Sequence, residues 1–179
     1  MTTANVRDLS PERQAALAKL RARRAAGINR VPRDGGPLPC SFEQRRMWLA
    51  AQVDPDNVAN VTAGLSLRGP LDTEALEAAA ATLVSRHEAL RTVLVDVDGD
   101  PCQQILPELA APFTVVDLSA ADDAEAQAAA LARQAAGERF DLARAPLFRA
   151  HLYRLAAEDH RLMLVWHHAV ADGLSLIHI

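Results

Sequence analysis

The order of helical and strand patterns along residues 41–166 limits this chain to folds in which helices cover a mixed sheet. Segments that follow a capping residue and keep apolar residues on one side predict helices, and short apolar or alternating runs between turn residues predict strands. We therefore predict an α/β fold, an α+β sandwich in which helices cover one mixed sheet. The predicted helices are residues 42–52, 73–90 and 119–138, and the predicted strands are 61–68, 93–97, 102–106, 113–116, 147–155 and 161–166.

Capping and turn residues set the ends of several of these elements. Ser41 and Gln44 have the spacing of a capping box, which predicts a helix start. Asp72 and Ser119 stand at the starts of the next two predicted helices and can cap them. The pair Asp98-Gly99 between two strand patterns predicts a tight hairpin turn.

Three histidines fall within or between these elements, and each has an ordinary structural explanation. His87-Glu88 begins like a metalloprotease HExxH motif, but Arg91 stands where the second histidine belongs, so that interpretation fails. We expect His87 to be a buried, hydrogen-bonded residue on the core-facing side of its helix. His151 is expected at the surface of a strand, and His160 in a turn.

A basic leader precedes an acidic body. Residues 1–33 contain eight Lys or Arg and two acids, a net charge of +6, so the remainder carries −10 of the total of −4. Ser10-Pro11 predicts the start of a basic linker helix over residues 14–24, and Gly27 can end it. The Pro- and Gly-rich residues 29–39 predict a linker. We assign residues 1–39 to the leader and linker, and residues 40–179 to one lobe.

Composition excludes several classes of function. A net charge of −4 argues against bulk binding of nucleic acid. Cys40 and Cys102 lack the spacing of a zinc site or a disulfide framework, and phosphate-binding glycine motifs are absent. No apolar run approaches the ~20 residues of a membrane span, so we expect a cytoplasmic protein with no membrane partner. With an aromatic share of only 4%, the core must be built from Ala, Leu and Val.

The most chemically suggestive segment follows the last strand pattern, where the apolar run 162–166 leads into His167-His168 and then Asp172-Gly173. Neighbouring residues on a strand point to opposite faces, so one histidine can face a cleft while the other points into the lobe. Such a pair is a poor metal chelate, and we expect no bound metal. A nearby carboxylate can fix a turn or an imidazole tautomer, and glycine permits backbone shapes that other residues forbid. A purely structural histidine pair is the alternative.

Four segments, in order, resemble motifs of the condensation domains of nonribosomal peptide synthetases. Residues 167–173, HHAVADG, match the HHxxxDG motif. The segments SFEQRRMW (41–48), RHEALRT (86–92) and FDL…APLFRA (140–150) resemble the opening helix, the RHExLRT segment and the FDLxxxPLxRA segment. Leu174 replaces a frequent Trp, and residues 176–179 match nothing expected of the family. His167 at the first motif position argues against the heterocyclising subgroup.

This resemblance implies a chloramphenicol acetyltransferase-like fold, of which the chain covers the N-terminal lobe. It implies amide-bond formation between an acyl or peptidyl thioester and an aminoacyl thioester, both held on the phosphopantetheine of carrier domains. The implied partners are donor and acceptor carrier domains, an adenylation domain and a C-terminal lobe, with no bound cofactor. His168 would act on the amine and the Gly173 N–H on the oxyanion. His167 and Asp172 would support the site. Asp172 would pair with an arginine, for which Arg91 is one candidate and a residue of the C-terminal lobe is the other.

Three other functions remain open on these residues. Another acyltransferase with an HxxxDG site and an epimerisation domain would share the motif. A non-catalytic docking lobe would use the histidines only for structure. In each case an isolated lobe is expected to be inactive alone, because the implied active-site tunnel lies between two lobes.

Overall fold

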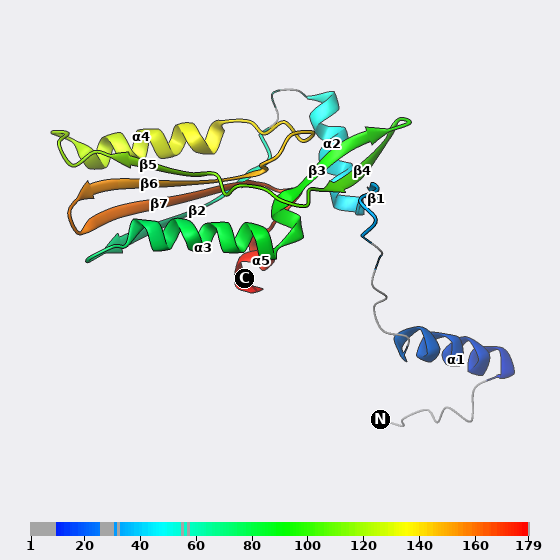
Figure 1. Cartoon of the computed structure of the whole chain (residues 1–179). Helices are drawn as coiled ribbons and strands as arrows, with labels where there is room; N and C mark the ends of the chain where they lie inside the picture. Colours follow the sequence, from blue (N-terminus) through cyan, green and yellow to red (C-terminus); the bar gives the residue numbers. More distant parts are fainter. Residues whose placement is uncertain (1–9, 26–30, 32, 55, 57, 179) are drawn as a thin grey trace. The chain divides into compact units, whose positions relative to one another are not determined.

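The computed structural model describes residues 10–25, 31, 33–54, 56 and 58–178, without the side chains of residues 17, 20–25 and 176–178 (Figure 1). The chain forms two compact units, residues 1–34 and 35–179. The first unit contains helix α1, Pro11–Ala25, which includes the predicted residues 14–24. The Ser10 carbonyl accepts a hydrogen bond from the Gln14 N–H (2.9 Å), as predicted for a helix start at Ser10. Gly27 and part of the predicted linker lie outside the described residues.

The second unit has the predicted α+β class but contains two sheets, not one. The larger sheet has the order β2-β7-β6-β5, and the smaller has the order β1-β4-β3. The prediction of one sheet was wrong because the β3–β4 hairpin does not pair with the larger sheet and instead pairs with Leu38 and Pro39, at the end of the predicted linker. The strands are β1 Leu38–Pro39, β2 Asn60–Arg68, β3 Thr92–Val97, β4 Asp100–Ile105, β5 Phe113–Asp117, β6 Phe148–Ala156 and β7 Asp159–His167.

The pairing is antiparallel except between β5 and β6, which run parallel. The turn between β3 and β4 has positive φ at both central residues, 55° at Asp98 and 89° at Gly99. This is the backbone of the two-residue hairpin turn that Asp-Gly predicts. The Asp96 carboxylate accepts a hydrogen bond from the Gly99 N–H at 2.8 Å.

Two predicted helices have different ends in the structure. The helix predicted over 73–90 ends at Arg86, because His87 is extended (φ −106°, ψ 103°) and a separate 3₁₀ turn follows. The helix predicted from Ser119 begins at Ala124, because Asp123 caps it and the Ser119 side chain donates to Asp117 instead. The helices of this unit are α2 Phe42–Val53, α3 Thr73–Arg86, η2 Glu88–Arg91, α4 Ala124–Gly137 and α5 Gly173–His178.

Helices α3 and α4 lie on opposite faces of the larger sheet (Figure 1). On the α3 side the sheet presents Leu162, Leu164 and Trp166 of β7. On the α4 side Tyr153 packs with Ala128, and the alanines of α4 let the helix approach the strands closely. The most deeply buried side chains include Leu94, Leu147, Leu152 and Val165, in agreement with the predicted Leu- and Val-rich core.

The histidines outside the motif differ from expectation. His160 belongs to β7 and is only 4% exposed, so the prediction of a turn residue was wrong. His151 is half-buried, with an enclosed Nε2, and not at the surface. Burial lowers the pKa of His151 below its ordinary value. His87 is half-buried at the end of α3, and its side chain forms no hydrogen bond with any described residue.

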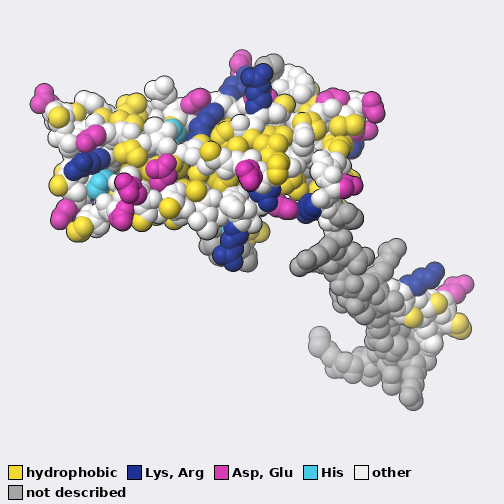
Figure 2. Space-filling view, in the orientation of Figure 1, with side chains coloured by type: hydrophobic (Ala, Val, Ile, Leu, Met, Phe, Trp, Pro, Cys, Tyr) yellow, Lys and Arg dark blue, Asp and Glu magenta, His cyan; other side chains and the backbone are white. Residues whose placement is uncertain are grey.

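Large apolar side chains remain exposed on and just after α2. The side chains of Phe42 and Val53 are 79% and 84% exposed, and Leu49 and Val58 are also exposed. Figure 2 shows apolar side chains across much of the visible face of this unit.

Candidate functional site

The end of β7 presents the two motif histidines in opposite directions. His167 is 5% exposed, whereas the side chain of His168 is exposed. The backbone on each side is fixed, because the His167 N–H donates to the Leu147 carbonyl and the His168 N–H donates to the Ala59 carbonyl, both at 2.9 Å. This is the arrangement that alternation along a strand predicts.

The surroundings of His167 keep its ring neutral and in one orientation. Its Nδ1 accepts a hydrogen bond from the Ala169 N–H at 3.1 Å, so the ring proton belongs on Nε2. The ring of Phe140 meets it edge-on, with centroids 6.4 Å apart and planes at 85°. Burial, and then the neighbouring charge of His168, lower the pKa of His167 to about 4. His167 is therefore not a proton carrier at neutral pH.

Two further side chains hold the loop that follows the histidines. The Trp166 indole N–H donates to the Ala171 carbonyl at 3.0 Å. The Gln44 side-chain amide donates to the Ala169 carbonyl at 3.3 Å and to the Gln103 side chain at 2.9 Å. Sequence reasoning identified Gln44 only as a helix cap, and its contact with the motif loop was missed. Its place in the segment that resembles the family's opening helix was the available signal.

Asp172 binds locally and not to the predicted arginine. Its carboxylate accepts hydrogen bonds from the Ser175 N–H and hydroxyl, both at 2.8 Å. These bonds are the main cause of a lowered Asp172 pKa. Arg91 and Asp172 form no ion pair, because the Arg91 side chain donates to the Leu106 carbonyl at the end of β4. The predicted ion pair between Arg91 and Asp172 is therefore wrong for the part of the chain that the structure describes.

Gly173 begins α5, with its backbone outside the positive-φ region. A side chain built on Gly173 would meet no atom within 4 Å. Within the described residues, neither the backbone conformation nor the surrounding space therefore requires glycine at this position. Its location still places a backbone N–H at the end of the motif loop.

A hollow of about 220 Å³ lies beside His168, lined also by Glu43 and Met47 of α2 and by Asp172. The Glu43 carboxylate is already held by Arg46, with an N–O distance of 2.8 Å. Among the described residues, no cluster of three or more His, Cys, Asp or Glu side chains could hold a metal ion. The hollow offers the exposed imidazole of His168, a side-chain type that serves in general acid–base catalysis.

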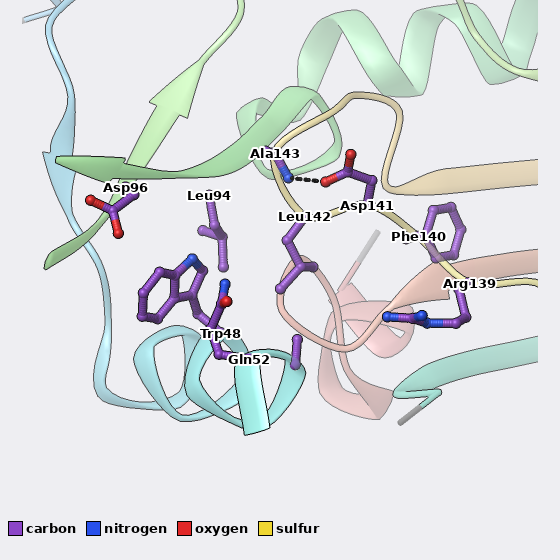
Figure 3. A pocket seen from close by; sticks show the side chains of 10 residues that line it. Trp48, Gln52, Leu94, Asp96, Arg139, Phe140, Asp141, Leu142 and Ala143 are labelled. Carbon is purple, nitrogen blue, oxygen red and sulfur yellow. Dashed lines mark hydrogen bonds between the residues drawn. The ribbon is translucent and has the colours of Figure 1, made fainter. Parts of the chain in front are cut away.

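A larger hollow, about 570 Å³, lies elsewhere, and neither motif histidine lines it. It lies between α2, β3 and the loop after α4 (Figure 3), with Trp48, Leu94 and Leu142 along its wall. Asp141 on this loop accepts a hydrogen bond from the Ala143 N–H at 3.0 Å. We place the candidate site at the smaller hollow because the exposed imidazole of His168 lies there. Among the described helices, none has the length and apolar character needed to cross a membrane.

Comparison with solved structures places this fold among condensation domains. The first condensation domain of the calcium-dependent antibiotic synthetase, in complex with a substrate analogue, superimposes with a TM-score of 0.72 at 27% identity. That match covers 79% of this chain and 35% of the solved chain. The tallysomycin biosynthesis protein TlmII gives a TM-score of 0.71 at 31% identity, covering 80% of this chain and 36% of the other.

Sequence comparison leads to the same family. Phosphinothricin tripeptide synthetase PhsC of Streptomyces viridochromogenes is 43% identical over 176 residues, which are 94% of this chain and 16% of that protein. The isonitrile lipopeptide synthase of Mycobacterium tuberculosis is 40% identical over 178 residues, 98% of this chain and 7% of that protein. The chain thus spans less than a fifth of either relative. Since the condensation-domain family model matches residues 36–178, the chain belongs to the condensation-domain family of nonribosomal peptide synthetases.

Proposed function

We propose that residues 40–179 form the N-terminal lobe of a domain that joins an acyl or peptidyl thioester to the amine of an aminoacyl thioester. The observation that carries this proposal is the contrast within the histidine pair. His168 is exposed beside a hollow, whereas His167 is buried with a pKa lowered to about 4. Of the two, only His168 is accessible to a substrate, and the lowered pKa of His167 argues against His167 as the group that handles the proton.

A thioester is already activated, so the domain has to position two substrates and manage one proton. In this proposal His168 accepts a hydrogen bond from the attacking amine, either removing its proton or orienting it. The Gly173 N–H donates to the oxyanion of the tetrahedral intermediate. His167 fixes the loop through Ala169, and Asp172 holds the turn that follows. Only His168 and Gly173 would touch the reacting atoms.

The substrates would arrive on the phosphopantetheine arms of donor and acceptor carrier domains, with an adenylation domain beside them. A C-terminal lobe would close the open side of the hollow. The exposed apolar side chains of α2 support this partner, because Glu43 and Met47 of the same helix line the hollow beside His168. A lobe that packs on α2 would bury apolar surface and exclude water from the site.

A hybrid domain tests the reaction class. Residues 36–172 replace the matching segment of the first condensation domain of the calcium-dependent antibiotic synthetase, and the hybrid receives both carriers loaded with thioester substrates. Mass spectrometry of the acceptor carrier is expected to show an amide product that is lost in the His168→Ala hybrid. Inversion of a substrate's α-carbon without amide formation would indicate an epimerisation domain. Acyl transfer to free amines only would indicate another acyltransferase, and a folded hybrid with no product in any assay would favour a docking lobe.

A further inference from the structure

The loop after α4 packs directly against the buried motif histidine. Helix α4 ends at Gly137, and three residues later the Phe140 ring meets the His167 ring edge-on. Phe140 is only 8% exposed. The direction of the His167 ring therefore depends on where this loop places Phe140.

Arg149 of β6 holds that loop at three points. Its guanidinium donates to the carbonyls of Glu138 (3.0 Å) and Arg139 (2.9 Å). Its Cζ lies 3.9 Å from the centroid of the Phe140 ring. The side chain is 20% exposed, and one nitrogen lies 3.4 Å from the Glu138 carboxylate. A planar guanidinium can donate to two carbonyls while stacking on an aromatic face, which a lysine ammonium cannot do.

Asn60 of β2 fixes the same loop from the neighbouring strand. Its side-chain amide donates to the carbonyls of Ala136 (2.8 Å) and Glu138 (2.9 Å), which lie at the end of α4, where carbonyls have no donor within the helix. Asn60 is also the register partner of His167 in the β2–β7 pair. The end of α4 is thus tied to both strands that flank the motif histidines.

We propose that Arg149 and Phe140 are positioning residues for His168: Arg149 holds the Phe140 ring against His167, and this contact fixes the loop that presents His168. The catalytic part of this inference rests on the proposed function. Neither residue lines the hollow beside His168, so neither is proposed to touch a substrate. Their effect passes through the His167 ring and its hydrogen bond with the Ala169 N–H.

The first test uses the 179-residue chain and does not depend on catalysis. In ¹⁵N spectra, wild-type His167 is expected to show a single tautomer with an unprotonated Nδ1. Arg149→Lys and Phe140→Leu are each expected to give a mixture of tautomers at His167 while the chain stays folded. Arg154→Lys is the matched control, since Arg154 lies on the same strand in an exposed ion pair with Asp117 at 3.5 Å. This control is expected to leave the His167 signals unchanged.

The second test uses the hybrid domain. Arg149→Lys and Phe140→Leu are each expected to lower kcat by about tenfold to a hundredfold with little change in KM, because a small misplacement of a reacting group has effects of that size. The double variant is expected to have a kcat no lower than that of the slower single variant, because the two residues act through one contact. If Arg149→Lys does not fold, the inference is judged on Phe140→Leu alone, with the same two measurements, the His167 tautomer and kcat.

Unchanged His167 tautomers in both folded variants would overturn the inference, as would fully additive losses of kcat. An inactive wild-type hybrid would contradict the proposed function alone, because the tautomer spectra still test the contact between Arg149, Phe140 and His167.

Discussion

Replacing His167 with asparagine should remove a specific part of the pH dependence of stability. The folded pKa of His167 is about 4, against an ordinary value near 6.5. The unfolded chain therefore binds one more proton between these values, so the free energy of unfolding falls as the pH drops from 6.5 towards 4. This difference between the folded and unfolded pKa of His167 lowers the free energy of unfolding by about 3 kcal/mol over the whole range in which His167 titrates. Between pH 7.5 and pH 5 the free energy of unfolding falls by about 2 kcal/mol.

Asparagine is the informative substitution because its side-chain oxygen can accept the hydrogen bond from the Ala169 N–H without titrating. Urea unfolding followed by tryptophan fluorescence reports on the unit of residues 35–179, since Trp48 and Trp166 both lie there. The wild type is expected to lose about 2 kcal/mol more than His167→Asn between pH 7.5 and pH 5. His168→Asn is the control and should keep most of this loss, because burial, the larger cause of the lowered His167 pKa, remains. Equal losses in the wild type and His167→Asn would refute the reasoning.

Three smaller predictions concern the loop and the turn. Trp166→Phe leaves the Ala171 carbonyl without its indole donor and should lower the free energy of unfolding by about 2 kcal/mol in urea titrations; a loss no larger than in a surface variant would contradict this. Gln44→Glu keeps the capping acceptor of α2 but removes the donor to Ala169, so a loss of about 1 kcal/mol with unchanged helix content by circular dichroism is expected. Gly99→Ala should lower the free energy of unfolding by about 1 kcal/mol because φ at Gly99 is 89°. Gly64 has no positive φ, so Gly64→Ala should lower it by less. Equal shifts of the melting temperature in the two variants would argue against backbone strain at Gly99.

The parts of the fold that the sequence predicted are those set by local chemistry. The capping box at Ser41 and Gln44 forms as its spacing indicates, with both reciprocal hydrogen bonds present. The Asp98-Gly99 turn joins its strands as predicted. His167 is buried and His168 exposed, as expected from alternation, although β7 ends at His167 and His168 already belongs to the following turn.

The parts that differ depend on contacts between distant segments. Leu38 and Pro39 have the composition of a linker, and only pairing with β4 makes them a strand. The helix before His87 ends without a glycine or proline, so no residue type marks its end. Gln44 looked like a cap because its second function, donation to the Ala169 carbonyl, joins residues 125 positions apart.

At the site, too, the sequence did not predict which groups would contact one another. Asp172 was expected to need an arginine, yet the Ser175 hydroxyl and N–H satisfy it within one turn. The placement of Phe140 against His167 could not be read from spacing, because it depends on Arg149 and Asn60 meeting at the end of α4. Sequence patterns identified the titratable residues, but the hydrogen bonds that orient them appear only in the fold.

The central claim is that the exposed histidine of the pair acts on the substrates while the buried one holds the loop. Single-turnover amide formation by the hybrid domain, with both carriers saturating, measures this directly in the His168→Ala and His167→Asn variants. The account predicts a rate about 10²- to 10⁴-fold lower for His168→Ala, as for the loss of a proton-transfer group. For His167→Asn it predicts a smaller loss, about tenfold to a hundredfold, because the contact with Phe140 is lost while the Ala169 N–H keeps an acceptor. A His168→Ala hybrid that forms the amide at the wild-type rate would contradict it.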